Sequence, residues 1–588
     1  MRLRHLAQAA LPVLVVSGCL LPSFDNVAAP AAGGGAGLGG SGGDAGEAAA
    51  AGEGGEAGTA TPASATLVDD VYSVLQGSTL SVPAPGVLEN DSGTTLVVTA
   101  TDDSDAARPK SYDATKLSIA EDGALEFEPQ PDFFGSYSLQ YTVKDGTGQS
   151  TTATVTIHVQ PVSAKLAAVR DGIGGFVIDG AAKDAIGAAI SSAGDVNHDG
   201  FDDLLIGAPT SAVGAGRAYV VYGRARTSTV ALQALPAKSS ERTFFDFEGV
   251  AGDGLGNAVA GIGDLNGDGF SDFAVAATGA APAGAVYVLF GGALSGGYAL
   301  GALTSARGAR LTGGTAPIGE LIGGAGDVNG DGTPDLLVSG ASNNGHVYAV
   351  LGSDRLKDSP IDSLTGLFQI EGGSINEGLP SSLDTVGKLA GDDKDAVVLA
   401  SQGGVVVVRG SSAAYPADSS KATVEGAAGF YYPLLNPTKP QVAVAGAGNV
   451  DADAAHVDDV MICELLAGVG QCRVLLNSSA TNPWLISGFS GLPHLGHGAD
   501  LNGDGLSDLL FGDATTAYAV FGKKGAHPAL DVTSLGDAGF SLEAEASTQI
   551  DAVATLGDVN GDGIADYAVG SSAAHGGTGT VYVIFGEN

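Results

Sequence analysis

The chain has 588 residues, with 26 Lys and Arg against 66 Asp and Glu, so its formal net charge is −40. This acidic excess argues against nucleic acid or an anionic membrane surface as the main partner, because both require clustered Lys and Arg. Charged residues make up only 16% and apolar residues 44%, so the chain as a whole is not a disordered acidic one. The 93 Gly residues indicate many tight turns between short strands.

Residues 1–19 have the pattern of an export signal. Arg2 and Arg4 give a basic start, and the apolar run Leu6–Val16 is too short to span a bilayer. The run ends in Val16-Ser17-Gly18-Cys19, which resembles the bacterial lipobox. The resemblance implies lipidation of Cys19, and Leu20 after it implies an outer-membrane lipoprotein that is periplasmic or surface-exposed, with membrane contact through the lipid only. An ordinary signal peptide with an incidental Cys is the alternative.

Residues 20–65 contain mainly Gly, Ala, Ser and Glu, which cannot build a core, so we expect a flexible linker. Residues 66–162 alternate apolar and polar positions, for example in Leu125–Glu128 and Thr152–Val159, and this predicts an antiparallel β-sandwich. Its stretches 69–72, 85–91 and 134–146 resemble bacterial cadherin-like, Ig-like modules of surface proteins. The resemblance implies a spacer. Two interpretations of four polar residues stay open, calcium ligands between modules or turn residues: Asp70, Asn90, Asp91 and Asp145.

Residues 165–588 repeat about every 60 residues. A β-rich run that ends in Gly, or once in Asn, occurs seven times, with last residues Gly223, Gly291, Gly352, Gly410, Asn477, Gly522 and Gly586. Strand-rich units of this size stack because none buries both faces alone. We therefore predict an all-β fold with a seven-bladed β-propeller; an array of sandwiches is the alternative.

The ends of this region predict how the ring closes. A short strand, Phe176–Gly180, precedes the first loop, and no such strand follows the last run, Val581–Phe585. Pairing the two completes the last blade and removes an open sheet edge.

The loops carry the most specific chemistry in the chain. The pattern Asp-x-Asn-x-Asp-Gly-x-x-Asp occurs five times, starting at Asp195, Asp264, Asp327, Asp500 and Asp558. Oxygen-bearing side chains at positions 1, 3, 5 and 9, a Gly at position 6 and the carbonyl of position 7 suit Ca²⁺ in number and flexibility. An EF-hand would need Glu at position 12, where these loops have apolar residues. Asp, Asn and Gly also favour plain turns, but five copies with one spacing favour about five calcium sites.

The segment Leu204–Pro209, between the loop at Asp195 and the run Tyr219–Gly223, resembles the FG-GAP repeat of integrin α-subunit propellers. The resemblance covers residues 165–588 and implies a seven-bladed propeller with calcium in some blades. By the same resemblance the ligands are Asp195, Asn197, Asp199, Phe201 and Asp203; Asp264, Asn266, Asp268, Phe270 and Asp272; Asp327, Asn329, Asp331, Thr333 and Asp335; Asp500, Asn502, Asp504, Leu506 and Asp508; and Asp558, Asn560, Asp562, Ile564 and Asp566.

Two repeats depart from the pattern, and we expect no metal in either. In the fourth, residues 389–398, the loop is shortened and Lys394 intrudes. In the fifth, residues 449–459, there are two extra residues and the turn Gly is missing.

Besides Cys19 the chain has two cysteines, which predict a disulfide. Cys463 ends an apolar run and Cys472 opens the next strand, so the two should lie on neighbouring strands. Export makes oxidation plausible. Two buried free thiols are the alternative.

No catalytic constellation is visible, so we expect no enzyme. The histidines are scattered, His494 and His497 are interpreted as loop residues, and motifs for nucleophilic or metallopeptidase chemistry are missing. The expected function is binding or adhesion at the cell surface, with a surface protein or a glycan as partner and no nucleic acid. A polysaccharide-binding or lyase-like polysaccharide-cleaving propeller is the alternative.

Overall fold

Nearly all of the regular structure is β, as the alternating patterns predict, so the all-β prediction is confirmed. The computed structural model describes residues 65–102, 116–131, 133–181, 183–224, 230–232, 244–292, 298–314, 316–340, 346–353, 356–364, 368–371, 381–400, 404–412, 429–435, 441–452, 457–478 and 482–587. The helices among them are short: α1 (Leu166–Arg170), α2 (Ser211–Gly214) and α4 (Ala574–Gly577), with six single 3₁₀ turns. None of the described helices is long and apolar enough to cross a membrane.

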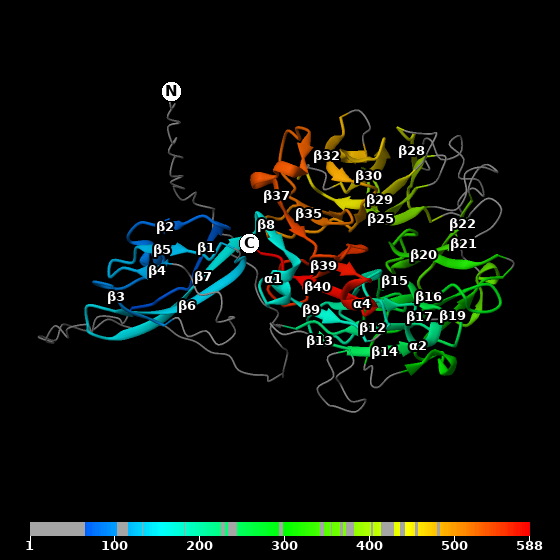
Figure 1. The fold of residues 1–588 in the computed structure, drawn as a ribbon, viewed down its shortest axis with the longest axis horizontal. Helices are drawn as coiled ribbons and strands as arrows, with labels where there is room; N and C mark the ends of the chain where they lie inside the picture. The colour runs from blue at the N-terminus through cyan, green and yellow to red at the C-terminus, as the bar shows by residue number, and fades with distance from the viewer. Residues whose placement is uncertain are drawn as a thin grey trace, which may run out of the picture. The chain divides into compact units, whose positions relative to one another are not determined.

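The first domain contains β1 to β7, blue to cyan in Figure 1. One sheet has the order β1 (Asp70–Leu75), β7 (Ser150–Gln160), β6 (Gly135–Lys144), β3 (Val97–Asp102), and the other β2 (Leu80–Val82), β5 (Leu125–Glu128), β4 (Lys116–Ile119). Alternate residues of β6, such as Tyr137 and Tyr141, are buried against Val155 and Ile157 of β7. This is the half-buried pattern that the sequence predicts.

Seven further sheets form from the described residues, and we number them by their innermost strands. The list of strands, from innermost to outermost, is: sheet one, β10 (Ala189–Gly194), β11 (Asp203–Ala208), β12 (Arg217–Val221), β14 (Phe244–Glu248), β18 (Tyr298–Ala299); sheet two, β15 (Leu255–Gly263), β16 (Asp272–Ala277), β17 (Ala285–Leu289), β19 (Gly308–Thr312), β23 (Ser359–Pro360); sheet three, β20 (Ile318–Gly326), β21 (Asp335–Gly340), β22 (His346–Val350), β24 (Phe368–Glu371); sheet four, β25 (Ser382–Lys388), β26 (Asp395–Ala400), β27 (Val405–Val408), β28 (Gly429–Tyr432); sheet five, β29 (Val442–Gly448), β30 (Asp459–Leu466), β31 (Val469–Leu475), β32 (Trp484–Ser490), β36 (Leu530–Asp531); sheet six, β33 (His494–Leu495), β34 (Leu509–Gly512), β35 (Thr516–Val520), β37 (Gly539–Glu543), β8 (Ser163–Lys165); sheet seven, β38 (Ala552–Gly557), β39 (Asp566–Ser571), β40 (Thr580–Ile584), β9 (Gly175–Asp179), β13 (Val230–Ala231).

The innermost strands contact one another in numerical order, and β38 of sheet seven contacts β10 of sheet one, which closes a circle. Apolar clusters fill the space between adjacent sheets; Leu205 of sheet one, for example, shares a cluster with Phe273 of sheet two. The second strands are buried on both faces, which explains why β11 and β16 have continuous apolar runs instead of alternation. This arrangement is that of a β-propeller.

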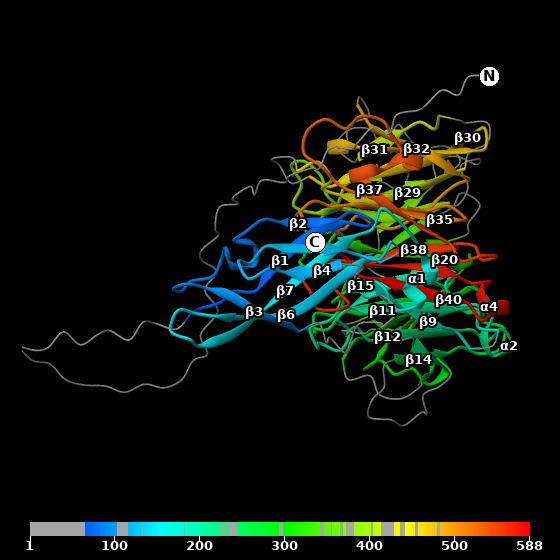
Figure 2. The same ribbon diagram turned by 60° about the vertical axis from the view of Figure 1, so that its left-hand side comes forward.

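The predicted ring closure is confirmed. Strand β9 pairs antiparallel with β40, with Ile178 opposite Val581 and Phe176 opposite Val583. Figures 1 and 2 show cyan β9 beside red β40, although the two strands are far apart in sequence. The same N-terminal stretch also supplies β8, which adds in parallel to β37 of sheet six, a contribution that the sequence does not predict.

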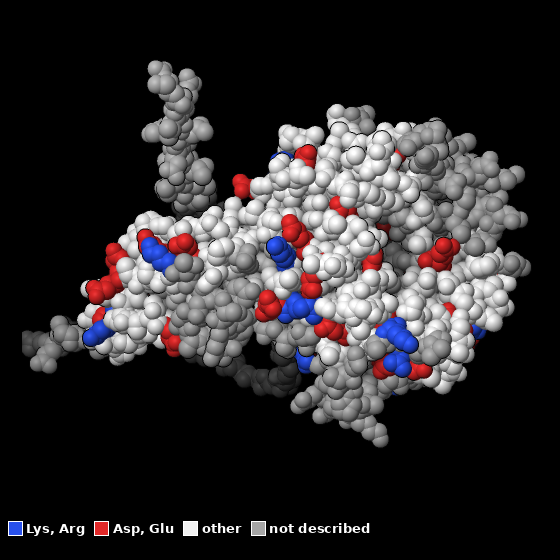
Figure 3. All heavy atoms as spheres, viewed as in Figure 1, with Lys and Arg blue, Asp and Glu red and all other residues white. Residues whose placement is uncertain are grey.

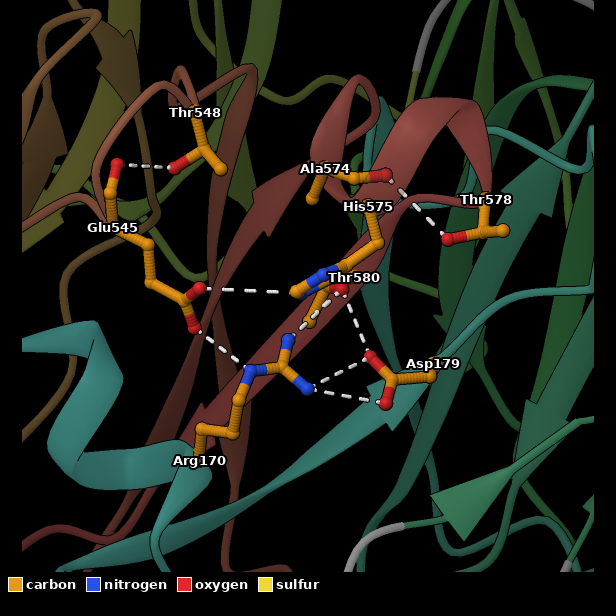
Figure 4. A network of polar contacts seen from close by, with 8 residues as sticks. All are labelled: Arg170, Asp179, Glu545, Thr548, Ala574, His575, Thr578 and Thr580. Carbon is orange, nitrogen blue, oxygen red and sulfur yellow. Dashed lines mark hydrogen bonds and ion pairs between the residues drawn. The ribbon is translucent and has the colours of Figure 1, made fainter.

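Arg170 of α1 fixes this closure (Figure 4). Its Nε donates to Glu545 Oε1 at 2.8 Å, its Nη1 to Asp179 Oδ2 at 3.1 Å and its Nη2 to Thr580 Oγ1 at 3.2 Å. Thr580 in turn donates to Asp179 Oδ1 at 2.9 Å. One guanidinium therefore connects β9, β40 and the segment that follows β37.

The first domain packs against the ring, although its sequence was interpreted as a spacer; both fall in one compact unit, residues 62–588. Ser136 Oγ and His158 Nδ1 each lie 2.8 Å from Glu587 Oε2. The Phe134 ring lies directly against Gly174, where a Cβ would come within 2.4 Å of it. The domain and the ring also share one apolar cluster, so they are joined by packing as well as by the chain.

Cys463 and Cys472 lie opposite each other on β30 and β31 and are joined by a disulfide. Closing a loop of this size is worth about 2–3 kcal/mol in the chain-entropy model. We predict that thiol labelling of the denatured, unreduced protein finds neither cysteine free, and that the reduced protein unfolds at a lower temperature. Two labelled residues at positions 463 and 472 would contradict the pairing.

Candidate metal centres

The five intact loops occupy one equivalent place in five sheets. Each lies between the innermost strand and the second strand of its sheet, in sheets one, two, three, six and seven. Because these five sheets are consecutive around the circle, the loops form one continuous arc. Sheets four and five make up the rest of the ring.

The side chains at positions 1, 3 and 5 wrap around the turn. In sheet one, Asp195 accepts hydrogen bonds from the backbone N–H groups of Asp199 at 3.1 Å and Gly200 at 2.9 Å. Asn197 Oδ1 accepts from the same Asp199 N–H at 2.9 Å, so its oxygen lies beside that of Asp195. Asp199 Oδ1 accepts from the N–H of Phe201 at 3.1 Å. The other four loops repeat these bonds.

The turn needs a left-handed backbone at two positions. Gly200 at position 6 has φ of 92°, as the sequence predicts. Position 4 is left-handed as well, and four loops have Gly there, whereas sheet one has His198 with φ of 60°. The Gly at position 4 is a signal that the sequence interpretation missed.

The Asp at position 9 is fully buried and both of its oxygens are used. Asp203 Oδ2 accepts from the N–H of Val196 at 3.0 Å, and Oδ1 accepts from the N–H of Gly223 at 2.8 Å. The same pair of bonds occurs at Asp272, Asp335, Asp508 and Asp566. This residue therefore fastens the loop to the Gly that ends the β-rich run of the third strand, so the loop motif and that run are joined by hydrogen bonds.

These buried carboxylates are electrostatically unfavourable when ionised. Burial, with a smaller contribution from the neighbouring carboxylates of Asp199 and Asp195, raises the pKa of Asp203 to about 8. The pKa is raised in the same way to about 7 at Asp272 and Asp335, and to about 8 at Asp508 and Asp566. A nearby cation would favour the ionised form.

The donor set fits a hard cation in its chemistry, since each loop offers three carboxylates, one amide and a backbone carbonyl. Within the described ranges, however, no three Asp, Glu, His or Cys side chains surround one point that would hold a metal ion. The loop carboxylates instead accept backbone N–H groups, so holding an ion requires them to turn towards a shared centre.

The loop of sheet four is not shortened, and this part of the sequence interpretation is corrected. Gly387 pairs with Ala396 as Gly194 pairs with Asp203 in sheet one, so residues 388–396 span the same nine positions. Position 1 is Lys388, position 3 is Ala390 and position 9 is Ala396. The ligand set is missing although the loop length is retained.

Sheet five keeps the position-9 Asp that hydrogen-bonds the loop to the third strand. Asp459 is buried and accepts from the N–H groups of Val450 at 3.1 Å and Asn477 at 2.7 Å. Asn477, with φ of 52°, stands where other sheets have Gly. Part of this loop, residues 453–456, lies outside the described residues.

In the first domain, the four polar residues make the contacts of turn and core residues. Asp70 Oδ2 accepts from the Tyr141 hydroxyl at 2.6 Å, and Asp91 accepts from the Val68 N–H at 2.8 Å. Asn90 donates to the Val68 and Asp69 carbonyls. Asp145 accepts from the N–H groups of Thr147 and Gln149. These contacts favour the turn interpretation over calcium.

The centre of the ring contains a cavity of about 800 Å³, lined by the innermost strands of all seven sheets. His494, His497, Asp384 and Asp551 lie in its wall. His497 Nδ1 lies 3.1 Å from Asp384 Oδ2, and although burial alone lowers the pKa of His497, this carboxylate raises it above its usual value. The sequence interpretation treated both histidines as plain loop residues, because strands far apart in the chain meet only in the ring.

Acidic and basic groups are interspersed on the face shown in Figure 3, and no extended basic patch is visible there. Cys19 and residues 20–64 of the proposed linker lie outside the described residues.

Two family models match the chain. A bacterial Ig domain matches residues 61–158, which include β1 to β6 and most of β7. An FG-GAP repeat matches residues 187–221 and 255–289, which contain the first three strands and the loop of sheets one and two.

Among curated proteins the repeats resemble integrin α-subunits. The chain is 35% identical over 164 residues to integrin alpha-3 of Cricetulus griseus, which is 27% of this chain and 14% of that protein. It is 30% identical over 211 residues to integrin alpha pat-2 of Caenorhabditis briggsae, which is 32% of this chain and 15% of that protein. The matched part therefore spans about one seventh of these relatives, and neither name is that of an enzyme. The chain thus contains a segment that matches a bacterial Ig domain and, after it, two segments that match the FG-GAP repeat, and its repeats are similar to those of integrin α-subunits.

Proposed function

We propose that this chain is an exported, lipid-anchored, calcium-binding protein that acts in binding or adhesion at the cell surface. The observation that carries the proposal is the arc of five identically built loops on one side of the innermost strands. The similarity of the repeats to integrin α-subunits supports it.

In this proposal Ca²⁺ is held at each intact loop by the side chains of positions 1, 3, 5 and 9 and the carbonyl of position 7. The ion supplies positive charge that neutralises the loop carboxylates. The residues of the chain do the rest: the Asp at position 1 curls the turn, and the Asp at position 9 fastens the turn to the third strand. Once the ion neutralises the carboxylates, they no longer repel one another. Each loop is then held in one conformation that a partner can bind.

The anchor in this proposal is lipidated Cys19, followed by the linker of residues 20–65. Several acyl chains would hold the protein on the outer membrane, at about 0.8 kcal/mol per buried CH₂. The linker would let the folded part stand clear of the lipid headgroups, so the protein meets its partner in the periplasm or outside the cell.

Polysaccharide binding is the second candidate, and the central cavity favours it. Its wall combines imidazole, carboxylate and hydroxyl groups, such as His497, Asp384 and Ser191, with small apolar residues. A hydroxylated ligand is recognised by such a mixture of hydrogen-bonding groups in a concave site.

A binding screen against glycans and cell-surface proteins, with and without Ca²⁺, tests the proposal and separates the two candidates. We expect a ligand whose binding is lost in chelator and weakened by Asp195→Ala, while His497→Gln leaves binding unchanged. Loss with His497→Gln alone would assign binding to the cavity instead. Binding that is indifferent to chelator and to Asp195→Ala would contradict the role of the loops.

A further inference from the structure

The hairpin of sheet four contains a positively charged side chain, that of Arg409. Arg409 directly follows β27, the third strand of this sheet, and precedes Gly410, the last residue of the β-rich run. At the same place the other six sheets have Tyr222, Phe290, Leu351, Leu476, Phe521 and Phe585. An arginine at this place therefore occurs in sheet four alone, whose loop has Lys388, Ala390 and Ala396 at positions 1, 3 and 9.

The guanidinium of Arg409 reaches back into the loop. Its Nη1 forms an ion pair with Asp392 Oδ2 and donates to the carbonyl of Ala390 at 3.4 Å. By the strand register these are positions 5 and 3 of the loop, two of the places that offer oxygen in the intact copies. The side chains of Arg409 and Asp392 are 21% and 22% exposed, so water only partly screens the pair.

A neighbouring aromatic ring holds the guanidinium in place. The Arg409 guanidinium carbon lies 4.8 Å from the centroid of the Phe430 ring, in β28 of the same sheet. Such stacking favours a planar, permanently charged group. Lys394 Nζ adds a second contact by pairing with Asp393 Oδ1 at 2.6 Å.

We propose that the Arg409 guanidinium takes the place of the metal ion in sheet four, so that this hairpin is closed by a covalently attached cation that a chelator cannot remove. The inference rests on the proposed calcium function of the other five loops. Sheet five, next along the ring, is braced by the Cys463–Cys472 disulfide and by buried Asp459. The ring therefore has a calcium-dependent arc of five sheets and a metal-independent sector of two.

A double-mutant cycle in excess chelator tests the assignment on the full chain. We expect Arg409→Met to lower the melting temperature by about 4 °C, because Asp392 is left without its partner. Adding Asp392→Asn should recover most of this loss, because the uncompensated charge is gone. The same cycle in excess Ca²⁺ should give the same coupling, and bound calcium should stay unchanged in all variants.

Arg473→Met is the matched control. Arg473, in β31, is also an arginine in an ion pair, with Glu464 at 2.7 Å in sheet five. Asp392→Asn should recover nothing in that background.

Two results would overturn the assignment: an Arg409→Met loss that Asp392→Asn does not reduce, or one bound calcium fewer in the Asp392→Asn variant. The proposed function fails separately, if the unmodified chain binds no calcium while the Arg409–Asp392 coupling is intact.

Discussion

Deleting Gly175–Gly180 should remove hydrogen-exchange protection from Val581–Ile584, at the opposite end of the propeller sequence. Strand β9 is the only described strand that separates β40 from short β13 at the outer edge of sheet seven, so its loss opens that sheet. The deletion also removes Asp179 from the contacts of Arg170. An open edge of this kind is prone to pair with other chains, so we expect lower thermal stability and aggregation on heating.

A point substitution gives the same test if the deleted chain does not fold. Val177 is fully buried in β9, and Val177→Asp places an unpaired carboxylate in the core, at a cost of about 3 kcal/mol or more. Val71→Asp is the matched control, since Val71 in β1 is 63% exposed. Intact protection at Val581–Ile584 with loosening confined to sheet one would contradict the closure.

In excess chelator, the melting temperature should fall as the pH rises from about 5 to 8. The folded-state pKa of the buried position-9 carboxylates is raised to about 7 or 8, from 3.8 in the unfolded chain. The folded state therefore binds more protons over this range, and its free energy of unfolding decreases as the groups ionise. Their stabilising effect is complete below the unfolded pKa and is lost as the pH passes the folded pKa.

Calcium should reverse this dependence, because a bound cation favours the ionised carboxylates and binds only the folded state. We expect a gap between the calcium and chelator melting temperatures that widens with pH and reaches roughly 10 °C at pH 8. Asp393→Ala is the control, since Asp393 is an exposed residue of the sheet-four hairpin. The difference between the calcium and chelator melting temperatures of this variant should match that of the unmodified chain. Parallel curves in the two conditions at all pH values would contradict the prediction.

Local sequence was sufficient to predict the strands, the loops and the closure. Continuous apolar runs such as Leu204–Ile206 follow from burial on both faces, and the seven runs ending in Gly or Asn identify the third strands. The pairing of β9 with β40 could be predicted because the repeat region has one short strand before its first loop and lacks such a strand after its last run.

Apart from the closure, contacts between distant segments were not predictable. Strand β8 and Arg170 have no repeat signature, and only the folded ring places them beside sheets six and seven. The loop of sheet four seemed shortened because its Lys and Ala residues hide the alignment, which only the register of β25 with β26 reveals. The fastening role of Asp203 likewise depends on Gly223, which lies 20 residues further along the chain.

The most direct test of the central claim is a count of calcium ions bound per chain, measured by titration of the metal-free protein. We predict about five ions of modest affinity, one fewer in each of the variants Asp195→Ala, Asp264→Ala, Asp327→Ala, Asp500→Ala and Asp558→Ala, and an unchanged count in Asp393→Ala. A chain that binds no calcium, or whose count is the same in all of these variants, would contradict the account.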